Sequence, residues 1–130
     1  MPVFLVLGIF LIANPFVVEA SDLSPAIAAA IADAQETHEE KLSVLVDTTK
    51  RSNAWGDLGM LYHANHLRLL AQNAYDSALE EQSIPKWYYL RGVVRAEMGD
   101  VQGSFEDFQL FVNGNPVSYT HLTLPTNREV

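Results

Sequence analysis

Trp55-Gly-Asp-Leu-Gly-Met-Leu-Tyr62, followed by Ala71-Gln-Asn-Ala-Tyr-Asp-Ser-Ala-Leu79, decides the fold of this chain, because the pattern of both stretches occurs a second time. Large, small and aromatic positions have counterparts 33 residues further along. The pairs are Trp55 and Tyr88, Leu58 and Arg91, Gly59 and Gly92, Tyr62 and Arg95, Ala71 and Ser104, Tyr75 and Phe108, and Ala78 and Phe111. A fixed offset of this kind indicates a protein built from repeated structural units.

The spacing within each copy predicts helices. Trp55, Leu58 and Tyr62 lie at i, i+3 and i+7, which places them on one side of a helix. A second stripe with the same period consists of Leu67, Ala71, Tyr75 and Ala78. Each copy is therefore expected to be a pair of short amphipathic helices, which buries its apolar face only when a neighbouring pair stacks on it.

Small residues indicate where these helices meet. Gly59 in mid-helix costs about 1 kcal/mol relative to alanine, so we expect it at a helix crossing. Ala71 and Ala78 allow the same close approach, with Tyr75 filling the space between them. We expect helices near residues 53–64, 67–82, 86–98 and 101–113, no strand between Ser52 and Pro116, and burial of Trp55, Leu58, Tyr62, Tyr75 and Phe108.

The first copy, W-x-x-L-G-x-x-Y followed by A-x-x-x-Y-x-x-A-L, resembles the tetratricopeptide repeat, whose period is about 34 residues. The second copy keeps the glycine, the Gly99-Asp100 turn, the aromatic Phe108 and a closing Pro116, but it loses the leucine and both alanines. The resemblance covers residues 52–84 and 85–116 as two repeats. It implies an all-α fold, an α-solenoid of helix-turn-helix repeats.

The resemblance also implies a function. Stacked helix pairs of this family form a concave groove that binds a peptide of a partner protein. The groove positions of this chain would be Asn53, Gly56, Met60, His63, Lys86, Tyr89, Val93 and Glu97. Some relatives hold a terminal carboxylate with a lysine and asparagine clamp, but Gly56, Met60 and Val93 stand at the positions where such a clamp is needed. A clamp of that kind is therefore not expected.

The segment 21–51 precedes the repeats and is expected to be helical. Ser24-Pro25 is a helix start, with an N-cap serine and a proline in the first turn. We expect the segment to pack on the first repeat and cover its open face. A break within the polar stretch Gln35–Lys41, giving two helices, remains open, and residues 48–52 are interpreted as the turn into the first repeat.

The first 20 residues resemble a secretory signal peptide or a signal anchor. They are almost wholly apolar and end with Val18 and Ala20 in a small-x-small arrangement, before the polar Ser21-Asp22. No lysine or arginine precedes the apolar run, which leaves a true start codon upstream as an open alternative. The uninterrupted apolar run is shorter than the roughly 20 residues that a membrane span needs. We therefore expect export to the periplasm or cell envelope.

We interpret the last residues of the chain as not belonging to the native protein. Val117-Ser-Tyr-Thr-His-Leu-Thr-Leu-Pro-Thr126 matches one reading frame of a transposase-based sequencing-library adapter. We therefore interpret residues 117–130 as a non-native, irregular tail and the gene as cut after Pro116. The last helix would then lack a neighbour, so Phe105, Leu110 or Phe111 should be more exposed than its counterpart in the first copy.

Charge and cysteine content exclude several functions. The chain has a formal net charge of −8 and no cysteine. Binding to nucleic acid or to an anionic membrane surface requires clustered lysine and arginine, so neither is expected, and a membrane contact would come only through an uncleaved leader. Without cysteine, a disulfide framework and a lipoprotein attachment site are excluded.

No catalytic, cofactor-binding or metal-binding residue is predicted. His63 and His66 have a spacing that could place two imidazoles on one metal, with His38 and Glu39 as further ligands, but zinc requires three or four ligands in register. Solvated histidines are the favoured interpretation. The expected function is that of an exported scaffold that binds a partner protein or peptide. The alternative is that the repeats form the N-terminal region of a larger enzyme whose catalytic domain lies downstream.

Overall fold

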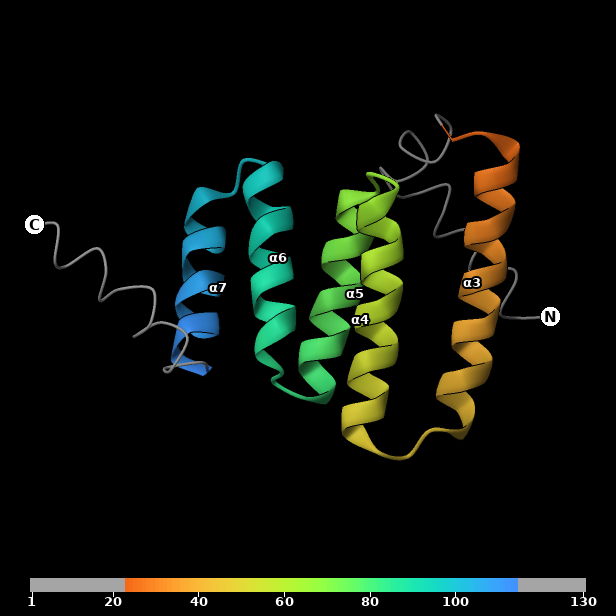
Figure 1. Cartoon of the computed structure of the whole chain (residues 1–130), viewed down its shortest axis with the longest axis horizontal. Coiled ribbons are helices and arrows are strands. Elements are labelled where there is room, and N and C mark those ends of the chain that lie inside the picture. Colours follow the sequence, from red (N-terminus) through yellow and green to blue (C-terminus); the bar gives the residue numbers. More distant parts are fainter. Residues whose placement is uncertain (1–22, 115–130) are drawn as a thin grey trace, which may run out of the picture.

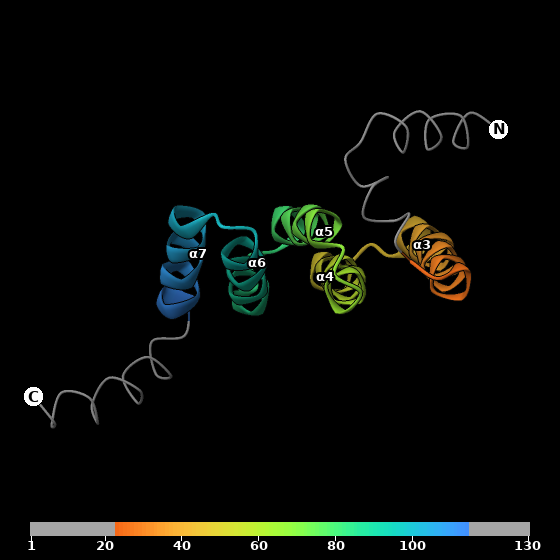
Figure 2. The same ribbon diagram turned by 90° about the horizontal axis from the view of Figure 1, so that it is seen from above.

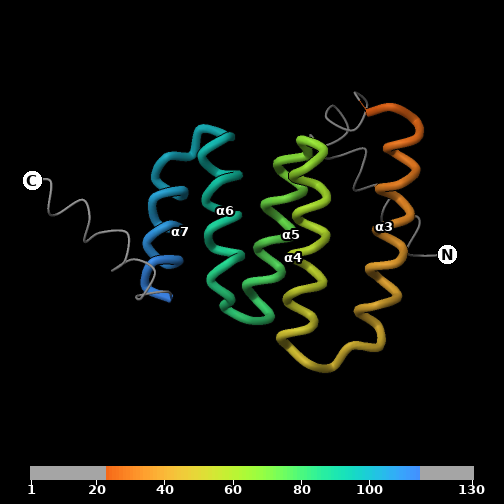
Figure 3. Tube along the Cα trace, in the orientation of Figure 1, coloured from red at the N-terminus to blue at the C-terminus, as the bar shows by residue number. Residues whose placement is uncertain are grey.

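The computed structural model describes residues 23–114, and within this range the chain is all-α. Its helices are α3 (Pro25–Val44), α4 (Thr48–Ala64), α5 (Arg68–Glu81), α6 (Pro85–Glu97) and α7 (Val101–Gly114). No strand occurs among these residues, which confirms the all-α part of the expected fold class. The helices stand side by side in chain order, and each runs opposite to the one before it (Figure 1, Figure 3). The view from above shows α4 with α5 and α6 with α7 as successive pairs (Figure 2).

The N-terminal segment differs from its prediction at two points. Helix α3 is continuous through Gln35–Lys41, because this stretch contains glutamate, glutamine and lysine, which favour helix, and neither glycine nor proline. The break lies instead at Leu45–Asp47. The Asp47 carboxylate accepts hydrogen bonds from Thr49 N (2.8 Å) and Lys50 N (3.1 Å) and so caps α4. The predicted turn at residues 48–52 is therefore wrong, since these residues form the start of α4.

The two hairpin turns have the same backbone structure. His66 between α4 and α5 has φ 62°, and Gly99 between α6 and α7 has φ 85°. Leu67 N donates to the carbonyl of Tyr62 (2.9 Å), and Asp100 N donates to the carbonyl of Arg95 (2.8 Å). This bond from the residue after a left-handed position back to the last helical turn is the Schellman arrangement. The 33-residue offset of the sequence is thus also an offset of local structure.

Close helix contact in the first hairpin occurs where the sequence predicted it. A Cβ atom on Gly59 would lie 2.6 Å from Cε1 of Tyr75, closer than real contacts allow. Ala71, Tyr75 and Ala78 are fully buried, as is Trp87 of α6. Because glycine and alanine let the helices approach, the Tyr75 ring fills the space between them. The predicted burial of Leu58, Tyr62 and Tyr75 is confirmed.

Trp55 and Phe108 are only half-buried, so their predicted burial is wrong in degree. The Trp55 ring makes a T-shaped contact with the His38 ring of α3, at 4.3 Å between centroids, and Trp55 also lines an open hollow. Phe108 packs on Tyr89 of α6 with a centroid distance of 5.7 Å, and α7 has no further helix of the described chain on its outer side. Trp55 thus borders an open hollow between α4 and α5, and Phe108 belongs to the last helix of the described row, so solvent reaches both rings.

Helix α3 packs on α4 through a small set of contacts. Gln35 donates from Nε2 to the hydroxyl of Tyr62 at 2.7 Å, and Ile31 and His38 are the buried residues of α3. Arg51 of α4 donates from Nη1 to the carbonyls of Leu42 (2.9 Å) and Leu45 (3.1 Å). These bonds fix the end of α3 against the start of α4.

The second hairpin is held by charges. Asp107 is 1% exposed and accepts hydrogen bonds from Arg91 Nη2 (2.7 Å), Arg91 Nε (3.0 Å) and Arg95 Nη1 (3.1 Å). Arg91 also donates from Nη1 to Asp76 of α5 at 2.8 Å. Burial lowers the pKa of Arg91, but the two carboxylates outweigh it and raise that pKa. The network therefore joins α6 to α7 and to α5.

The exposure predicted for the last helix is confirmed. Phe105 is 56% and Leu110 43% exposed, whereas their counterparts Gln72 and Ser77 are half-buried. Phe111 is half-buried, and its counterpart Ala78 is fully buried. The leader at residues 1–20 and the tail at residues 117–130 lie outside the described residues. Within residues 23–114, none of the helices combines the length and apolarity that spanning a membrane requires.

Candidate protein-binding surface

The predicted groove residues lie on two helices that run in the same direction, α4 and α6 (Figure 1). Each set follows the helical period, so it forms one stripe. Met60 is 40% and Tyr89 45% exposed, and Asn53, Lys86 and Glu97 are also exposed. His63 and Val93 are half-buried. We call the exposed and half-buried members the α4–α6 face: Asn53, Met60, His63, Lys86, Tyr89, Val93 and Glu97.

An ion-pair cluster joins the C-terminal ends of the two stripes. Glu97 of α6 lies 3.0 Å from Nε2 of His63 and accepts a hydrogen bond from Arg68 Nε at 2.9 Å. His63 and Arg68 belong to the first hairpin, so the cluster bridges the two copies. The hydrogen bonds from His63 and Arg68 lower the pKa of the Glu97 carboxyl below its usual range. This cluster links the C-terminal ends of α4 and α6.

Gly56 is the groove position that the structure places elsewhere. It is buried, and a Cβ atom there would overlap the Trp87 indole of α6. Trp87 is 1% exposed and stacks on Tyr75 at 6.0 Å between centroids. The glycine therefore serves the packing between the two copies, and it leaves no open surface for a partner. The sequence alone could not assign this role, because the indole comes from a helix that begins far along the chain.

Aromatic rings extend the α4–α6 face towards α7. Tyr89 lies 5.7 Å from Phe108 and 5.2 Å from Phe111 between ring centroids. Phe105 and Val101 of α7 are exposed further out, at 56% and 75%. Contiguous patches of exposed apolar side chains are a feature of interaction sites on protein surfaces. The C-terminal hairpin therefore has more exposed apolar surface than the first one.

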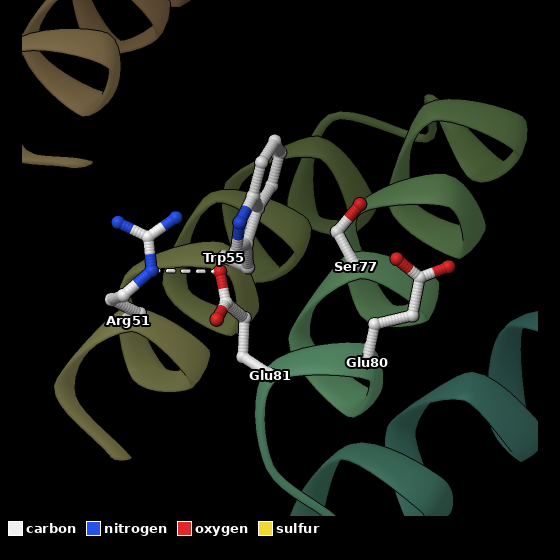
Figure 4. A pocket seen from close by; sticks show the side chains of 5 residues that line it. All are labelled: Arg51, Trp55, Ser77, Glu80 and Glu81. Carbon is white, nitrogen blue, oxygen red and sulfur yellow. Dashed lines mark hydrogen bonds and ion pairs between the residues drawn. The ribbon is translucent and has the colours of Figure 1, made fainter. Parts of the chain in front are cut away.

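A separate hollow of about 350 Å³ lies beside Trp55 (Figure 4). It is lined by Arg51 and Trp55 of α4 and by Ser77, Glu80 and Glu81 of α5. Arg51 Nε donates to Glu81 at 2.8 Å. Sequence reasoning missed this hollow, because adjacent carboxylates such as Glu80 and Glu81 diverge on a helix, and only the packing of α4 on α5 brings them to an indole.

The histidines take separate positions. His38 is buried under Trp55, and burial lowers its pKa. His63 pairs with Glu97, and His66 is exposed in the turn. Among residues 23–114, no group of three or more metal-ligating side chains comes together. His63 and His66 are thus placed as a bridge residue and a turn residue, and Glu39 is exposed on α3.

Compared with protein-family models, with curated proteins and with solved structures, the chain has no match.

Proposed function

We propose that this protein is an exported scaffold of the tetratricopeptide type, which binds a segment of a partner protein on the α4–α6 face. The observation that carries the proposal is the exposure of Met60 and Tyr89 on two parallel helices of successive copies. The equivalent turns at His66 and Gly99 support the repeat interpretation. Because the two turns have the same geometry, the helix pairs α4–α5 and α6–α7 have the same orientation along the chain.

The α4–α6 face has both apolar and hydrogen-bonding side chains, so it favours a partner segment that has both kinds. Tyr89 buries a large area at low entropic cost, and Met60 adapts its shape to an apolar anchor. Asn53 and Lys86 add hydrogen-bond donors near the N-terminal ends of α4 and α6. A peptide with one or two apolar side chains, flanked by a carboxylate or carbonyl groups, fits this set. The ion-pair cluster of His63, Arg68 and Glu97 lies at the other end of the face.

The test is a selection of peptides from a displayed random library on the immobilised full chain. Selected peptides should bind the wild type and lose about thirtyfold or more of their affinity on Tyr89→Ala, since truncation of a central aromatic anchor costs about 2 kcal/mol or more. Asn73→Ala is the matched control, because Asn73 is an exposed residue of α5 outside the face. Equal binding to both variants, or no selected peptide, would contradict the proposal.

A further inference from the structure

Helix α7 has an apolar stripe that is partly open to solvent. The stripe, at positions i, i+4, i+7 and i+11 of the helix, consists of Val101, Phe105, Phe108 and Val112, and we call it the α7 stripe. Val101 and Phe105 are exposed, and the other two residues are half-buried. Helix α7 is the last of the described row, with α6 on one side (Figures 1 and 2). Exposed apolar side chains in one row are typical of an interaction site.

The equivalent stripe of the first repeat is an interface between helices. The residues 33 positions earlier, on α5, are Arg68, Gln72, Tyr75 and Leu79. Arg68 donates a hydrogen bond to Glu97 of α6, and Tyr75 stacks on Trp87 of α6. On α5 this stripe therefore joins the first repeat to the helix that follows it. By the same geometry, the α7 stripe is the place where a further helix packs.

The charges show that this further helix differs from α6. Helix α6 is held to α5 by ion pairs with Arg68 and Asp76. At these two positions α7 has Val101 and Gln109, which carry no charge. A helix with the charges of α6 would leave them without partners on α7, and unpaired charges at an interface weaken binding. The α7 stripe therefore favours a helix that presents no charge.

The aromatic residues support the same conclusion. In the first repeat, the Trp87 indole of α6 packs against Gly56 and stacks on Tyr75. The residue equivalent to Gly56 is Tyr89, whose ring lies 5.7 Å from that of Phe108 between centroids. The second repeat thus fills with its own tyrosine the space that the following helix fills in the first. A helix that covers α7 has to pack on a surface that is already filled and uncharged.

We infer that the α7 stripe binds the same stripe of a second molecule of this protein, with the two α7 helices antiparallel. Each helix of the described row runs opposite to the one before it, and a two-fold axis perpendicular to α7 continues this alternation into the second molecule. The stripe is complementary to itself because none of its residues is charged. An axis near Phe108 and Gln109 places Phe105 of each molecule against Val112 of the other. The inference does not depend on the function proposed for the α4–α6 face.

Sedimentation equilibrium of the full chain tests the association. One helix pair is a small interface, so we expect a concentration-dependent equilibrium that ends at the dimer, where both stripes are covered. Added salt should strengthen the dimer, because the contact has no ion pair and each molecule has a net charge of −8. A monomer mass at every concentration up to about 1 mM, or weaker association at high salt, would overturn the inference.

Two substitutions separate the stripe from the rest of α7. Phe105→Glu places a charge in the contact twice, once from each molecule, so the dissociation constant should rise about a hundredfold or more. Leu110→Glu adds the same charge at an exposed residue of α7 outside the stripe, and it should leave the dissociation constant nearly unchanged. Circular dichroism verifies that both variants keep their helix content. Equal effects of the two substitutions would overturn the inference.

A mixture of two variants tests the pairing itself. Val112→Lys should weaken the dimer for the same reason as Phe105→Glu. In an equal mixture of the two, the introduced carboxylate meets the introduced ammonium group, and the unaltered Phe105 and Val112 meet at the second contact. A dimer should therefore form at concentrations where each variant alone is a monomer. A mixture that stays monomeric would overturn the two-fold arrangement.

Discussion

Arg91 donates two hydrogen bonds, of 2.7 and 3.0 Å, to the buried carboxylate of Asp107, at the positions where the first copy has Leu58 and Ala74. Arg95, which also donates to Asp107, replaces Tyr62. One helix pair is thus joined by apolar packing and its repeat by an ion network. The same backbone arrangement is compatible with both solutions.

Removal of Asp107 should be strongly destabilising. Asp107→Ala leaves Arg95 and part of Arg91 without a buried partner, and breaking a buried ion pair in this way costs about 3–5 kcal/mol. The triple variant Arg91→Leu, Arg95→Tyr and Asp107→Ala copies the residues of the first hairpin. Because apolar replacement of a whole buried network is often neutral, its free energy of unfolding should be close to that of the wild type. A triple variant less stable than Asp107→Ala in urea denaturation would contradict this account.

Tyr75 offers a test of core packing with two substitutions. Its ring is fully buried, burial raises its pKa, and its hydroxyl has no hydrogen-bond partner among the described residues. Tyr75→Ala should lower the free energy of unfolding by about 3–5 kcal/mol because it leaves a cavity. Tyr75→Phe removes only the unpaired hydroxyl, so it should be neutral or stabilising by up to about 1 kcal/mol. A large loss with phenylalanine would show that the hydroxyl has a partner.

Gly56 tests the contact between the two copies. Gly56→Ala places a methyl group in the Trp87 indole and should cost about 1–3 kcal/mol, despite the higher helix propensity of alanine. Asn73→Ala, an exposed change in α5, is the control and should change stability by less than about 0.5 kcal/mol. Thermal unfolding, followed by Trp87 fluorescence in a Trp55→Phe background, measures both. A Gly56→Ala protein as stable as its parent would show that the indole can move without cost.

His38 makes stability depend on pH. Its pKa in the folded protein is lowered by burial, mainly, and by Lys41, while Glu39 and a hydrogen bond with the Ala54 backbone act against this. Below the ordinary histidine value of 6.5, the unfolded chain therefore binds a proton that the folded chain does not. Stability should fall as the pH falls from 6.5 towards the folded pKa, and the loss is complete below that value. The contact to Trp55 and the packing of α3 on α4 would weaken together.

The variant His38→Phe retains an aromatic ring against Trp55 but cannot titrate. The difference in unfolding free energy between wild type and His38→Phe should therefore change between pH 6.5 and the folded pKa of His38, and it should be constant above pH 6.5. Glu97 acts at lower pH, because its lowered pKa gives stability that is present above 4.5 and is lost as the pH falls through the folded value. A constant difference between the two proteins from pH 7 to 5 would contradict the assignment to His38.

The sequence predicted the helices because the relevant signals are local. The i, i+3, i+7 stripe of Trp55, Leu58 and Tyr62 and the small residues at Gly59 and Ala71 specify a helix pair without knowledge of its neighbours. The start of α4 was missed because Asp47, a strong N-cap, lies before residues that were interpreted as a turn. Local capping outweighed the boundary that the repeat pattern suggested.

The surface was harder to predict, because its contacts join distant residues. No sequence pattern indicated that Trp87 covers Gly56, or that Glu97 pairs with both His63 and Arg68. The hollow at Trp55 likewise depends on the packing of α4 against α5. Met60 and Tyr89 were assigned to the surface through the resemblance to the tetratricopeptide repeat, and these two are exposed.

The most direct test of the central claim is to map a selected peptide on the full chain by backbone NMR. We expect the largest chemical-shift changes at Met60, Tyr89 and Val93, with smaller changes at Lys86 and none at Asn73, an exposed residue of α5 that is not part of the face. Such a map would place the partner on the α4–α6 face. Shifts confined to other helices, with Met60 and Tyr89 unaffected, would contradict the account.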